Sequence, residues 1–531
     1  MSKQVDVVII GAGFGGLYAL HKIRQLGLKC QVLEAGDDIG GTWQWNSYPG
    51  ARCDVESFQY SYSFDEDLEQ EWEWRERYAA QPEILAYLRH VAQRYQLLRD
   101  VCCNSRVESA VYDEGASLWT VKTADQHYHC RFLVSAVGCL STPNMPGIPG
   151  LDEFRGQLLH TGQWPREGVD LTGKRVGVIG TGSSGVQVIS DIAGQVDQLY
   201  VFQRTPHWVA MAGNRPLGED EKRTVKNNYR KMRAFMQQSL LGMNVAPGAK
   251  SALEVSDDER WQTYEKAWEL GGPALLMSYN DLLVNMEANK TAAAFMKAKI
   301  REIVKDPAIA EALIPDEDTY PLGGRRMVQD DNYYATFNRD NVTLVDTLKH
   351  PITAITRRGI NTGSGDYDLD VIIIATGFDA VTGTLKKIDI RGRGGLSIQD
   401  KWQEGPLTYL GVAMAGFPNL FMVTGPGSPS VLSNMVLSVE QHVDWIADAI
   451  AWMVRHGHVS MEASESAETN WADKVVEAAR PTVLFNTRSW YHGSNIAGKP
   501  KRFLAYLGGV GPYRAECDAE QDAGYPGFQV N

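Results

Sequence analysis

Hydrophobic and polar positions follow the same succession of patterns in two distant parts of the chain. Residues 5–10 form an apolar, β-branched run that leads into a glycine-rich turn and then into apolar positions at helical spacing over residues 17–26. The same order recurs at residues 175–179, which precede a second glycine-rich turn and a helical pattern over residues 186–193. A strand, a tight turn and a helix in this order begin a βαβ unit. We therefore predict an α/β fold with two Rossmann-like dinucleotide-binding domains.

The first glycine turn has the spacing of a dinucleotide-binding loop. The residues of this turn that we expect to contact the dinucleotide are Gly11, Gly13, Phe14, Gly15 and Gly16. Glycines allow a tight turn and a close backbone approach, and a helix N-terminus presents unpaired N–H groups to a pyrophosphate. A second predicted strand, residues 30–33, ends at Glu34, whose carboxylate can accept hydrogen bonds from ribose hydroxyls. A glycine turn without a ligand is the alternative, but the complete βαβ unit favours a dinucleotide.

The second glycine turn has the same spacing and indicates a second dinucleotide. The residues of this turn that we expect to contact it are Gly180, Thr181, Gly182, Ser183, Ser184 and Gly185. The strand predicted after it, residues 199–203, ends in Arg204 and Thr205 rather than in an acid. A guanidinium and a hydroxyl suit the 2′-phosphate of NADP, so this site favours NADP over NAD. Two dinucleotide folds in one chain are the arrangement of flavoproteins that hold FAD in one site and take NADPH in the other.

The rest of the pattern divides the chain into five segments. Residues 132–138 and 370–377 are apolar runs that end in glycine turns, and each would return a strand to one of the two units. Between residues 215 and 312 the pattern becomes helical. We predict the first part of an FAD domain (1–145), the first part of an NADP domain (146–214), a helical insertion (215–325), the second part of the NADP domain (326–385) and the second part of the FAD domain (386–531).

Charge and cysteine content argue against several other classes of protein. A formal net charge of -13 disfavours a nucleic-acid partner, which needs clustered Lys and Arg. No stretch is long enough to span a membrane, and the first residues lack the features of a signal peptide. The 7 cysteines include no CxxC pair and no metal-ligand spacing, which argues against a flavin disulfide reductase and favours a reducing cytoplasm. Adjacent Cys102 and Cys103 could be a redox pair, although neighbouring residues rarely close a disulfide.

Two longer motifs resemble a known family. Residues 154–165 fit the pattern FxGxxxHxxxWP at Phe154, Gly156, His160, Trp164 and Pro165. Residues 40–54, which begin Gly-Gly-Thr-Trp and end in Asp54, match a second motif of the same family. With these motifs the chain resembles the type I Baeyer–Villiger monooxygenases nearly end to end. Flavin monooxygenases that oxidise nitrogen or sulfur are the main enzymatic alternative, and they usually depart from the pattern at the tryptophan.

The resemblance implies an activity and a catalytic pair. NADPH would reduce FAD, O2 would form a C4a-peroxyflavin, and this species would attack a ketone to give an ester or lactone, with sulfoxidation as a side activity. Arg326 matches the family's active-site arginine, whose fixed charge would stabilise the anionic species. Asp54 matches the acid that orients this arginine. A surface charge for Arg326 and a structural cap or salt bridge for Asp54 are the alternatives, and His160 would link the nucleotide domains rather than act in the chemistry.

The resemblance also implies further binding residues. Beyond the first turn and Glu34, the expected flavin contacts are Gly41, Thr42, Trp43, Trp45, Asp54, Tyr60, Val107 and Met435. Beyond the second turn, the expected NADP contacts are Gln187, Arg204, Thr205, Arg325, Arg326 and Trp490. The residues expected to face the substrate are Ser430, Val431 and Leu432. Aromatic packing alone would also explain Trp43 and Trp45, and a solvated charge would explain Arg325.

The expected partners are O2 and a small ketone of a cyclic, aromatic or otherwise bulky apolar type. No nucleic acid, membrane, metal or obligate protein partner is expected. A non-catalytic sensor that binds NADPH or flavin is the alternative from a different class. Because the chain offers a candidate residue for every step of the reaction, we favour the enzyme.

Overall fold

A parallel five-stranded sheet contains the first glycine turn of the protein, whose computed structural model describes residues 2–496 and 498–531. The strand order is β20-β8-β2-β3-β4, and every neighbouring pair is parallel. The strands are β2 (Val7–Ile10), β3 (Cys30–Leu33), β4 (Val101–Cys102), β8 (Phe132–Ser135) and β20 (Leu420–Met422). The apolar run at residues 132–138 thus supplies a strand, β8, that lies directly beside β2.

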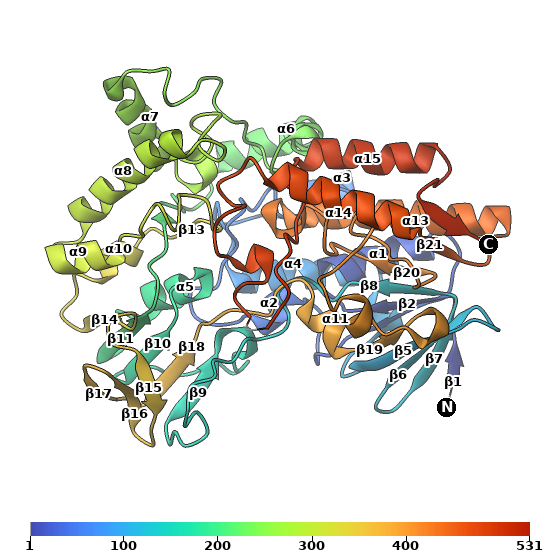
Figure 1. Ribbon diagram of the computed structural model, residues 1–531, viewed down its shortest axis with the longest axis horizontal. Coiled ribbons are helices and arrows are strands. Elements are labelled where there is room, and N and C mark those ends of the chain that lie inside the picture. Colours follow the sequence, from blue (N-terminus) through green and yellow to red (C-terminus); the bar gives the residue numbers. More distant parts are fainter. Residues whose placement is uncertain (1, 497) are drawn as a thin grey trace.

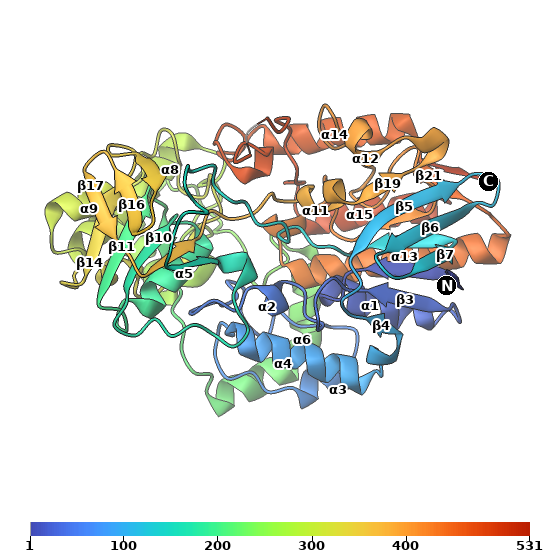
Figure 2. The ribbon, with the colours of Figure 1, turned by 90° about the horizontal axis from the view of Figure 1, so that it is seen from below.

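A second parallel five-stranded sheet contains the second glycine turn, with the order β14-β11-β10-β18-β9. Its strands are β9 (Gln157–His160), β10 (Arg175–Ile179), β11 (Gln198–Gln203), β14 (Val342–Asp346) and β18 (Val371–Ile374). Here β18, from the apolar run at residues 370–377, takes the place beside β10 that β8 has beside β2. The two sheets occupy opposite ends of the molecule (Figures 1 and 2). The protein is therefore an α/β fold with two Rossmann-like sheets.

The helices after the glycine turns begin earlier than the sequence pattern predicts. Helix α1 spans Phe14–Arg24 and helix α5 spans Ser183–Ile192. Gly13 and Gly182 are their N-caps and have extended backbone conformations, so the last residues of each glycine turn already belong to the helix. The predicted strand at residues 5–10 also starts later, at Val7, because residues 2–4 form a separate strand, β1, in another sheet.

Within residues 2–496 and 498–531, four further sheets accompany the two parallel ones, and one of the four also has five strands. The mixed sheet next to the first has the order β1-β7-β6-β5-β19, with β1 (Ser2–Gln4), β5 (Val107–Asp113), β6 (Leu118–Thr123), β7 (His127–Cys130) and β19 (Asp389–Arg391). An antiparallel sheet near the second consists of β15 (Ile352–Ile355), β16 (Gly359–Thr362) and β17 (Gly365–Asp368). Two-stranded sheets join β12 (Val209–Ala210) to β13 (Val328–Gln329) and β21 (Met461–Ala463) to β22 (Phe528–Val530).

The chain between β12 and β13 is helical. Its α-helices are α6 (Glu219–Gln238), α7 (Asp257–Leu270), α8 (Met286–Ile303) and α9 (Pro307–Leu313). Because β12 pairs with β13, the two ends of this region lie together, and α7, α8 and α9 form a lobe above the second sheet in Figure 1. Helix α6 extends from this lobe and packs against α3 (Glu66–Glu71) and α15 (Val510–Asp522). The helical region thus contacts both halves of the molecule.

The C-terminal part of the chain covers the first sheet. Helix α13 (Met435–His456) packs along α1, and α15 packs on α13 (Figure 1). Further α-helices are α2 (Thr42–Trp45), α4 (Gln81–Arg94), α10 (Tyr333–Thr336), α11 (Gly383–Lys387), α12 (Ile398–Lys401) and α14 (Glu465–Ala479). No α-helix within residues 2–496 and 498–531 is long and apolar enough to cross a membrane. All 7 cysteines are free thiols, so Cys102 and Cys103 form no disulfide.

Candidate active site

The two glycine turns have matching backbone geometry. Gly11 and Gly180 adopt φ angles of +101° and +111°, in the region that favours glycine. A Cβ atom on either residue would lie 2.6 Å from a carbonyl oxygen, that of Ala136 for Gly11 and that of Ala375 for Gly180. Both alanines directly follow the strand that returns to the sheet, β8 in one half and β18 in the other. The same close contact, between the first glycine of the turn and the end of strand β8 or β18, is therefore present in both halves of the molecule.

The helix N-termini beyond these turns are open to an anion. Neither α1 nor α5 has a side-chain cap or an acidic residue in its first turn. Their first N–H groups therefore lack the partners that helix caps supply, and a pyrophosphate would provide them. At Gly182 a Cβ atom would meet no other atom within 4 Å. At Gly16 and Gly185 it would lie 1.7 Å and 2.2 Å from the carbonyl oxygens of the first glycines of the two turns. Both turns fit a dinucleotide.

Glu34 lies at the end of β3, where it holds the first turn. Its Oε2 atom accepts a hydrogen bond of 2.7 Å from the N–H group of Ala12, and its Oε1 atom accepts one of 2.7 Å from that of Gly36. A carboxylate oxygen has two lone pairs, so each can still accept a bond from a ribose hydroxyl. The carboxylate thus fixes the loop and retains the capacity to bind a ribose.

Aromatic residues predicted to contact the flavin gather next to this turn. Trp43 donates a hydrogen bond of 3.3 Å from its indole N–H to the hydroxyl of Tyr60. Phe14, the first residue of α1, meets the Tyr60 ring edge-on at a centroid distance of 5.3 Å. Trp45, at the end of α2, is half-buried, and Thr42 at its start is exposed. The structure therefore brings Trp43, Tyr60 and Phe14 into one cluster.

The backbone of the second motif lies directly on the first turn. Gly41 has a φ angle of +54°, and a Cβ atom on it would lie 2.8 Å from the Cα atom of Gly13. Val107 and Met435 approach from other elements, because Val107 starts β5 and Met435 is the first residue of α13. Val107 packs in the core between the first sheet and the mixed sheet, whereas Met435 packs against the core that contains α1.

Arg326 and Asp54 form a bidentate ion pair. The Nε and Nη2 atoms of Arg326 donate hydrogen bonds of 2.8 Å and 2.7 Å to the two carboxylate oxygens of Asp54. The Nη1 atom donates one of 2.5 Å to the carbonyl oxygen of Val431. Burial by itself would lower the pKa of Arg326, but the Asp54 carboxylate outweighs burial, and the pKa is raised. The guanidinium is therefore held permanently charged in a fixed orientation.

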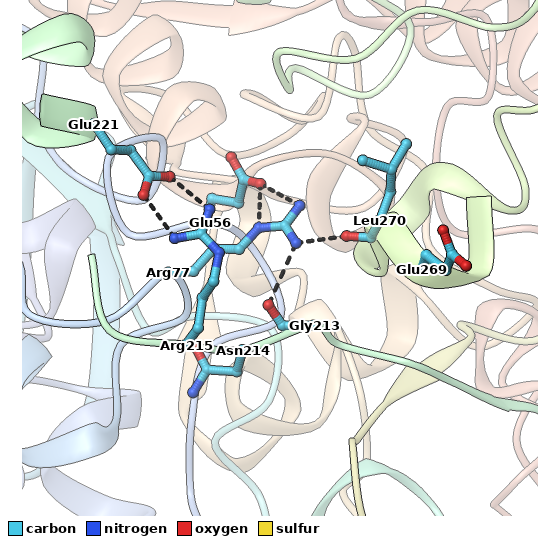
Figure 3. Close-up of a pocket in the computed structure, with 8 residues that line it drawn as sticks. All are labelled: Glu56, Arg77, Gly213, Asn214, Arg215, Glu221, Glu269 and Leu270. Atoms are coloured by element: carbon cyan, nitrogen blue, oxygen red, sulfur yellow. Dashed lines mark hydrogen bonds and ion pairs between the residues drawn. The ribbon is translucent and has the colours of Figure 1, made fainter. Parts of the chain in front are cut away.

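The segment that carries Asp54 is held by a hydrogen bond between Glu56 and Arg77. Glu56 accepts a hydrogen bond of 2.7 Å from the Nε atom of Arg77, whose Nη1 atom donates one of 2.6 Å to the carbonyl oxygen of Leu270 (Figure 3). Leu270 is the last residue of α7, so this arginine ties the Asp54 turn to the helical region. A cavity of about 510 Å³ opens at this contact, lined by Glu56, Arg77, Gly213, Asn214, Arg215, Glu221, Glu269 and Leu270. None of the residues predicted to bind cofactor or substrate lines it.

The loop predicted to face the substrate contacts Arg326 through its backbone. Ser430 is fully buried, has a φ angle of +45°, and its hydroxyl lies 3.0 Å from the thiol of Cys139. Val431 is buried and offers its carbonyl oxygen to the guanidinium, whereas Leu432 is half-buried. The side chain of Ser430 thus points to Cys139, and it is the backbone of this loop that reaches the ion pair.

Two arginines gather near the second turn. Burial lowers the pKa of Arg325, and the nearby positive charge of Arg204 lowers it further. Arg325 stacks on the ring of Tyr320 at 3.7 Å and donates a hydrogen bond of 3.0 Å to the carbonyl oxygen of Arg488. Within the part of the chain that the structure describes, neither Arg204 nor Arg325 has a carboxylate partner. Thr205 accepts a bond of 3.1 Å from the hydroxyl of Thr181 through its carbonyl oxygen. This arrangement suits a phosphate.

The two halves meet at the second motif. Tyr48 donates a hydrogen bond of 2.7 Å to the side-chain oxygen of Gln187 on α5, and the Gln187 amide nitrogen donates one of 3.1 Å to the carbonyl oxygen of Arg52. Both ends of Gln187 are therefore engaged at this contact. Trp164 packs in the same core as Tyr48, so the two family motifs share one cluster. Trp490 packs from the C-terminal loop against the cluster of Ala380, Val381 and Leu504.

Comparison with known proteins shows which family of enzymes this chain belongs to. A family model described as pyridine nucleotide-disulphide oxidoreductase matches residues 8–244. A cyclohexanone 1,2-monooxygenase from an Acinetobacter species is 43% identical over 100% of this chain and 98% of its own length. A Baeyer-Villiger monooxygenase from Pseudooceanicola batsensis is also 43% identical, over 99% and 96%. A phenazine N-monooxygenase from Lysobacter antibioticus is 42% identical over 98% and 96%. The solved structure of an oxidized steroid monooxygenase bound to NADP shares 49% identity with a TM-score of 0.95, over 99% of both chains.

The chain belongs to the Baeyer–Villiger monooxygenase family. It is a flavin-dependent monooxygenase that uses FAD and NADP(H). The disulfide chemistry in the description of the matching family model does not apply to this Baeyer–Villiger monooxygenase, because its cysteines are all free and the sequence contains no CxxC pair.

The sequence did not predict several contacts in the monooxygenase site. The carbonyl of Val431 is a ligand of Arg326, but a backbone group carries no signal in the residue type. The bond between Tyr48 and Gln187 also went unpredicted, although Tyr48 lies in the second motif and Gln187 in the first turns of α5. His442 on α13 and Tyr513 on α15 lie outside this site, and no motif in the sequence drew attention to either of them.

Proposed function

We propose that this monooxygenase inserts one oxygen atom of O2 beside the carbonyl of a bulky apolar ketone, with Arg326 as the catalytic cation and Asp54 as its partner. The observation that supports the proposal is the three-point hold on the guanidinium. Arginine has five N–H donors, and Asp54 and Val431 engage three of them. Two N–H groups, one on each terminal nitrogen, are left for an anion.

The two remaining N–H groups define what Arg326 does. Oxygen attack on a ketone moves negative charge onto the carbonyl oxygen, and donors fixed in advance stabilise such an oxyanion. Because Asp54 takes one edge of the guanidinium and Val431 takes part of another, the group cannot rotate away. Its side chain is 29% exposed, so the cation remains accessible while its hydrogen bonds maintain its orientation.

Bound FAD supplies the oxygen-transfer chemistry, with its electrons taken from NADPH. We propose that the first turn, Glu34 and the cluster of Trp43, Tyr60 and Phe14 hold FAD, and that the second turn, Arg204 and Arg325 hold NADPH through its phosphates. The sheets then correspond to an FAD domain at residues 1–145 and 386–531 and an NADP domain at 146–214 and 326–385, with the helical region at 215–325 between its parts. Ser430, Val431 and Leu432 would border the substrate.

The substrate class follows from what surrounds the cation. The ion pair adjoins the large core that contains Cys53, Val431, Tyr491 and Phe503, and apolar surroundings favour an apolar ketone. We expect esters or lactones as products and sulfoxides from sulfides as a side reaction. We also place the enzyme in a reducing cytoplasm, consistent with its free cysteines.

The proposal is tested by aerobic NADPH oxidation with phenylacetone, cyclohexanone or a large cyclic ketone, with product masses recorded. The expected product is an ester or lactone heavier than the ketone by one oxygen atom. Arg326→Ala should abolish it while FAD stays bound, and the control Arg223→Ala, which removes an exposed arginine on α6, should not. A protein that only senses its cofactors would show no ketone-stimulated NADPH oxidation. An N-oxygenating enzyme would convert phenazine but none of the ketones.

A further inference from the structure

Two polar residues, His442 on α13 and Tyr513 on α15, meet inside the core of the first half. His442 is 1% exposed and Tyr513 is 0% exposed. The Nε2 atom of His442 lies 2.7 Å from the hydroxyl oxygen of Tyr513. The site proposed above uses neither residue. A buried polar side chain needs hydrogen-bond partners. The groups that His442 and Tyr513 bind therefore indicate which part of the structure the two residues stabilise.

The partners are the backbones of two residues in left-handed conformations. The N–H group of Thr424 donates a hydrogen bond of 2.9 Å to the Nδ1 atom of His442, and Thr424 has a φ angle of +55°. The hydroxyl of Tyr513 donates one of 2.5 Å to the carbonyl oxygen of Leu410, whose φ angle is +54°. A side chain with a Cβ atom rarely adopts this conformation, least of all a β-branched one, unless its surroundings enforce it.

The hydrogen bonds determine the protonation of the ring. Because Nδ1 accepts from a backbone N–H group, it carries no proton, and the neutral ring carries its proton on Nε2. Nε2 therefore donates to Tyr513, whose own proton goes to Leu410. Burial lowers the pKa of His442 to about 3, so the ring stays neutral and keeps this pattern at physiological pH. The imidazole acts as one acceptor and one donor, in fixed positions.

A short chain of contacts leads from Thr424 to the catalytic arginine. The thiol of Cys139 donates a hydrogen bond of 3.3 Å to the carbonyl oxygen of Thr424 and lies 3.0 Å from the hydroxyl of Ser430. Ser430 is itself left-handed and precedes Val431, whose carbonyl oxygen accepts from Arg326. Thus both ends of the loop over residues 424–431 meet one buried thiol, and the end at Thr424 is held by His442.

We infer that His442 and Tyr513 are positioning residues that hold the loop over residues 424–431 so that Val431 fixes the orientation of Arg326. The inference rests on the proposed role of Arg326. Without the acceptor on His442, the N–H group of Thr424 has no hydrogen-bond partner among the described residues, and a contact that enforces its left-handed conformation is lost. The loop would then sample other conformations, the Val431 carbonyl would leave Arg326, and the cation would lose one of its three anchors.

Three variants test this, each prepared with FAD bound. His442→Leu removes both the acceptor and the donor, whereas His442→Gln keeps one of each, because an amide oxygen accepts and an amide nitrogen donates. Tyr513→Phe removes the hydroxyl alone. Tyr525→Phe is the matched control, because Tyr525 is a buried tyrosine whose hydroxyl has no partner among the described residues.

Hydrogen exchange of the backbone over residues 424–432 is the first measurement. We expect His442→Leu and Tyr513→Phe to exchange about ten- to a hundredfold faster than the wild type, and His442→Gln and Tyr525→Phe to match it. The second measurement is the fraction of NADPH oxidation that yields ester rather than hydrogen peroxide. This fraction should fall in the first two variants, with the KM for NADPH unchanged.

The outcomes separate the two ideas. If the wild type forms no ester from any ketone, the proposed function fails, whatever the loop does. If the wild type forms ester and His442→Leu and Tyr513→Phe keep wild-type loop exchange and ester yield, the inference is overturned. Should His442→Leu not accumulate as folded protein, Tyr513→Phe decides alone, because it changes no shape and removes only the link between His442 and Leu410.

Discussion

Arg326 donates two hydrogen bonds to the carboxylate of Asp54, although 272 positions separate them in the chain. Asp54 lies in the second family motif and Arg326 lies at the end of the helical region, just before β13. The pair thus spans the contact between the two halves of the molecule. Any movement of one half against the other acts directly on the orientation of the guanidinium.

Asp54→Asn tests whether orientation and charge both matter. The amide keeps the shape of the side chain but can accept on only one atom, so the fork of Arg326 loses one bond and its counter-charge. We expect kcat for ester formation to fall about a hundredfold, with FAD content unchanged. Arg326→Lys should lose as much, because an ammonium cannot hold a bidentate geometry. An Asp54→Asn enzyme with wild-type kcat would remove Asp54 from the mechanism.

Arg204 and Arg325 should determine the choice of nicotinamide cofactor. Loss of one charged hydrogen bond to the 2′-phosphate should raise the KM for NADPH about tenfold or more in Arg204→Ala or Arg325→Ala. The KM for NADH, which lacks that phosphate, should stay the same. Steady-state kinetics with both cofactors measure the effect, and Arg223→Ala is again the control. Equal losses for NADH and NADPH would show that the arginines support the fold rather than bind the phosphate.

The second glycine turn offers a matched pair of substitutions. A Cβ atom at Gly185 would lie 2.2 Å from a carbonyl oxygen, so Gly185→Ala must displace α5, at a loss of at least about 2 kcal/mol in the free energy of unfolding. At Gly182 a Cβ atom would meet nothing within 4 Å, so Gly182→Ala should leave stability within about 0.5 kcal/mol. It should raise the KM for NADPH, because the methyl group occupies space beside the proposed phosphate site. Thermal unfolding and kinetics together check both outcomes.

Glu440 on α13 should make stability depend on pH. Burial raises its pKa to about 7, and its oxygens accept hydrogen bonds of 2.6 Å and 2.7 Å from the N–H and hydroxyl groups of Ser63. Since the folded protein binds the proton more tightly than the unfolded chain, this group's contribution to stability is largest below about pH 4 and is lost as pH rises to about 7. Glu440→Gln should remove that loss and be more stable than the wild type at pH 8 by about 3 kcal/mol. Urea unfolding at pH 5 and pH 8 measures this, and an equal difference at both values would contradict it.

The spacing of nearby residues in the sequence was enough to predict the fold class and the two cofactors. The order of strand, glycine turn and helix predicted two βαβ units, and Arg204 and Thr205 after the second strand of the second unit favoured NADP over NAD. Two such units in one chain indicated a flavoprotein that holds FAD and takes NADPH. These features can be found in the sequence because they lie within about thirty residues of one another, and because a glycine that must avoid a carbonyl oxygen can be replaced by no other residue. The two family motifs added the class of reaction.

The tertiary structure alone decided how the site is assembled. Val431 holds Arg326 through a carbonyl group that every residue type possesses, and His442 holds Thr424 through a backbone N–H group. Gln187, which is expected to contact NADP, has both ends of its amide bonded to the second motif, and the sequence did not predict these bonds. Such contacts depend on how elements hundreds of residues apart pack together, and packing also decides which polar group is buried and must find a partner. No spacing in the sequence records that.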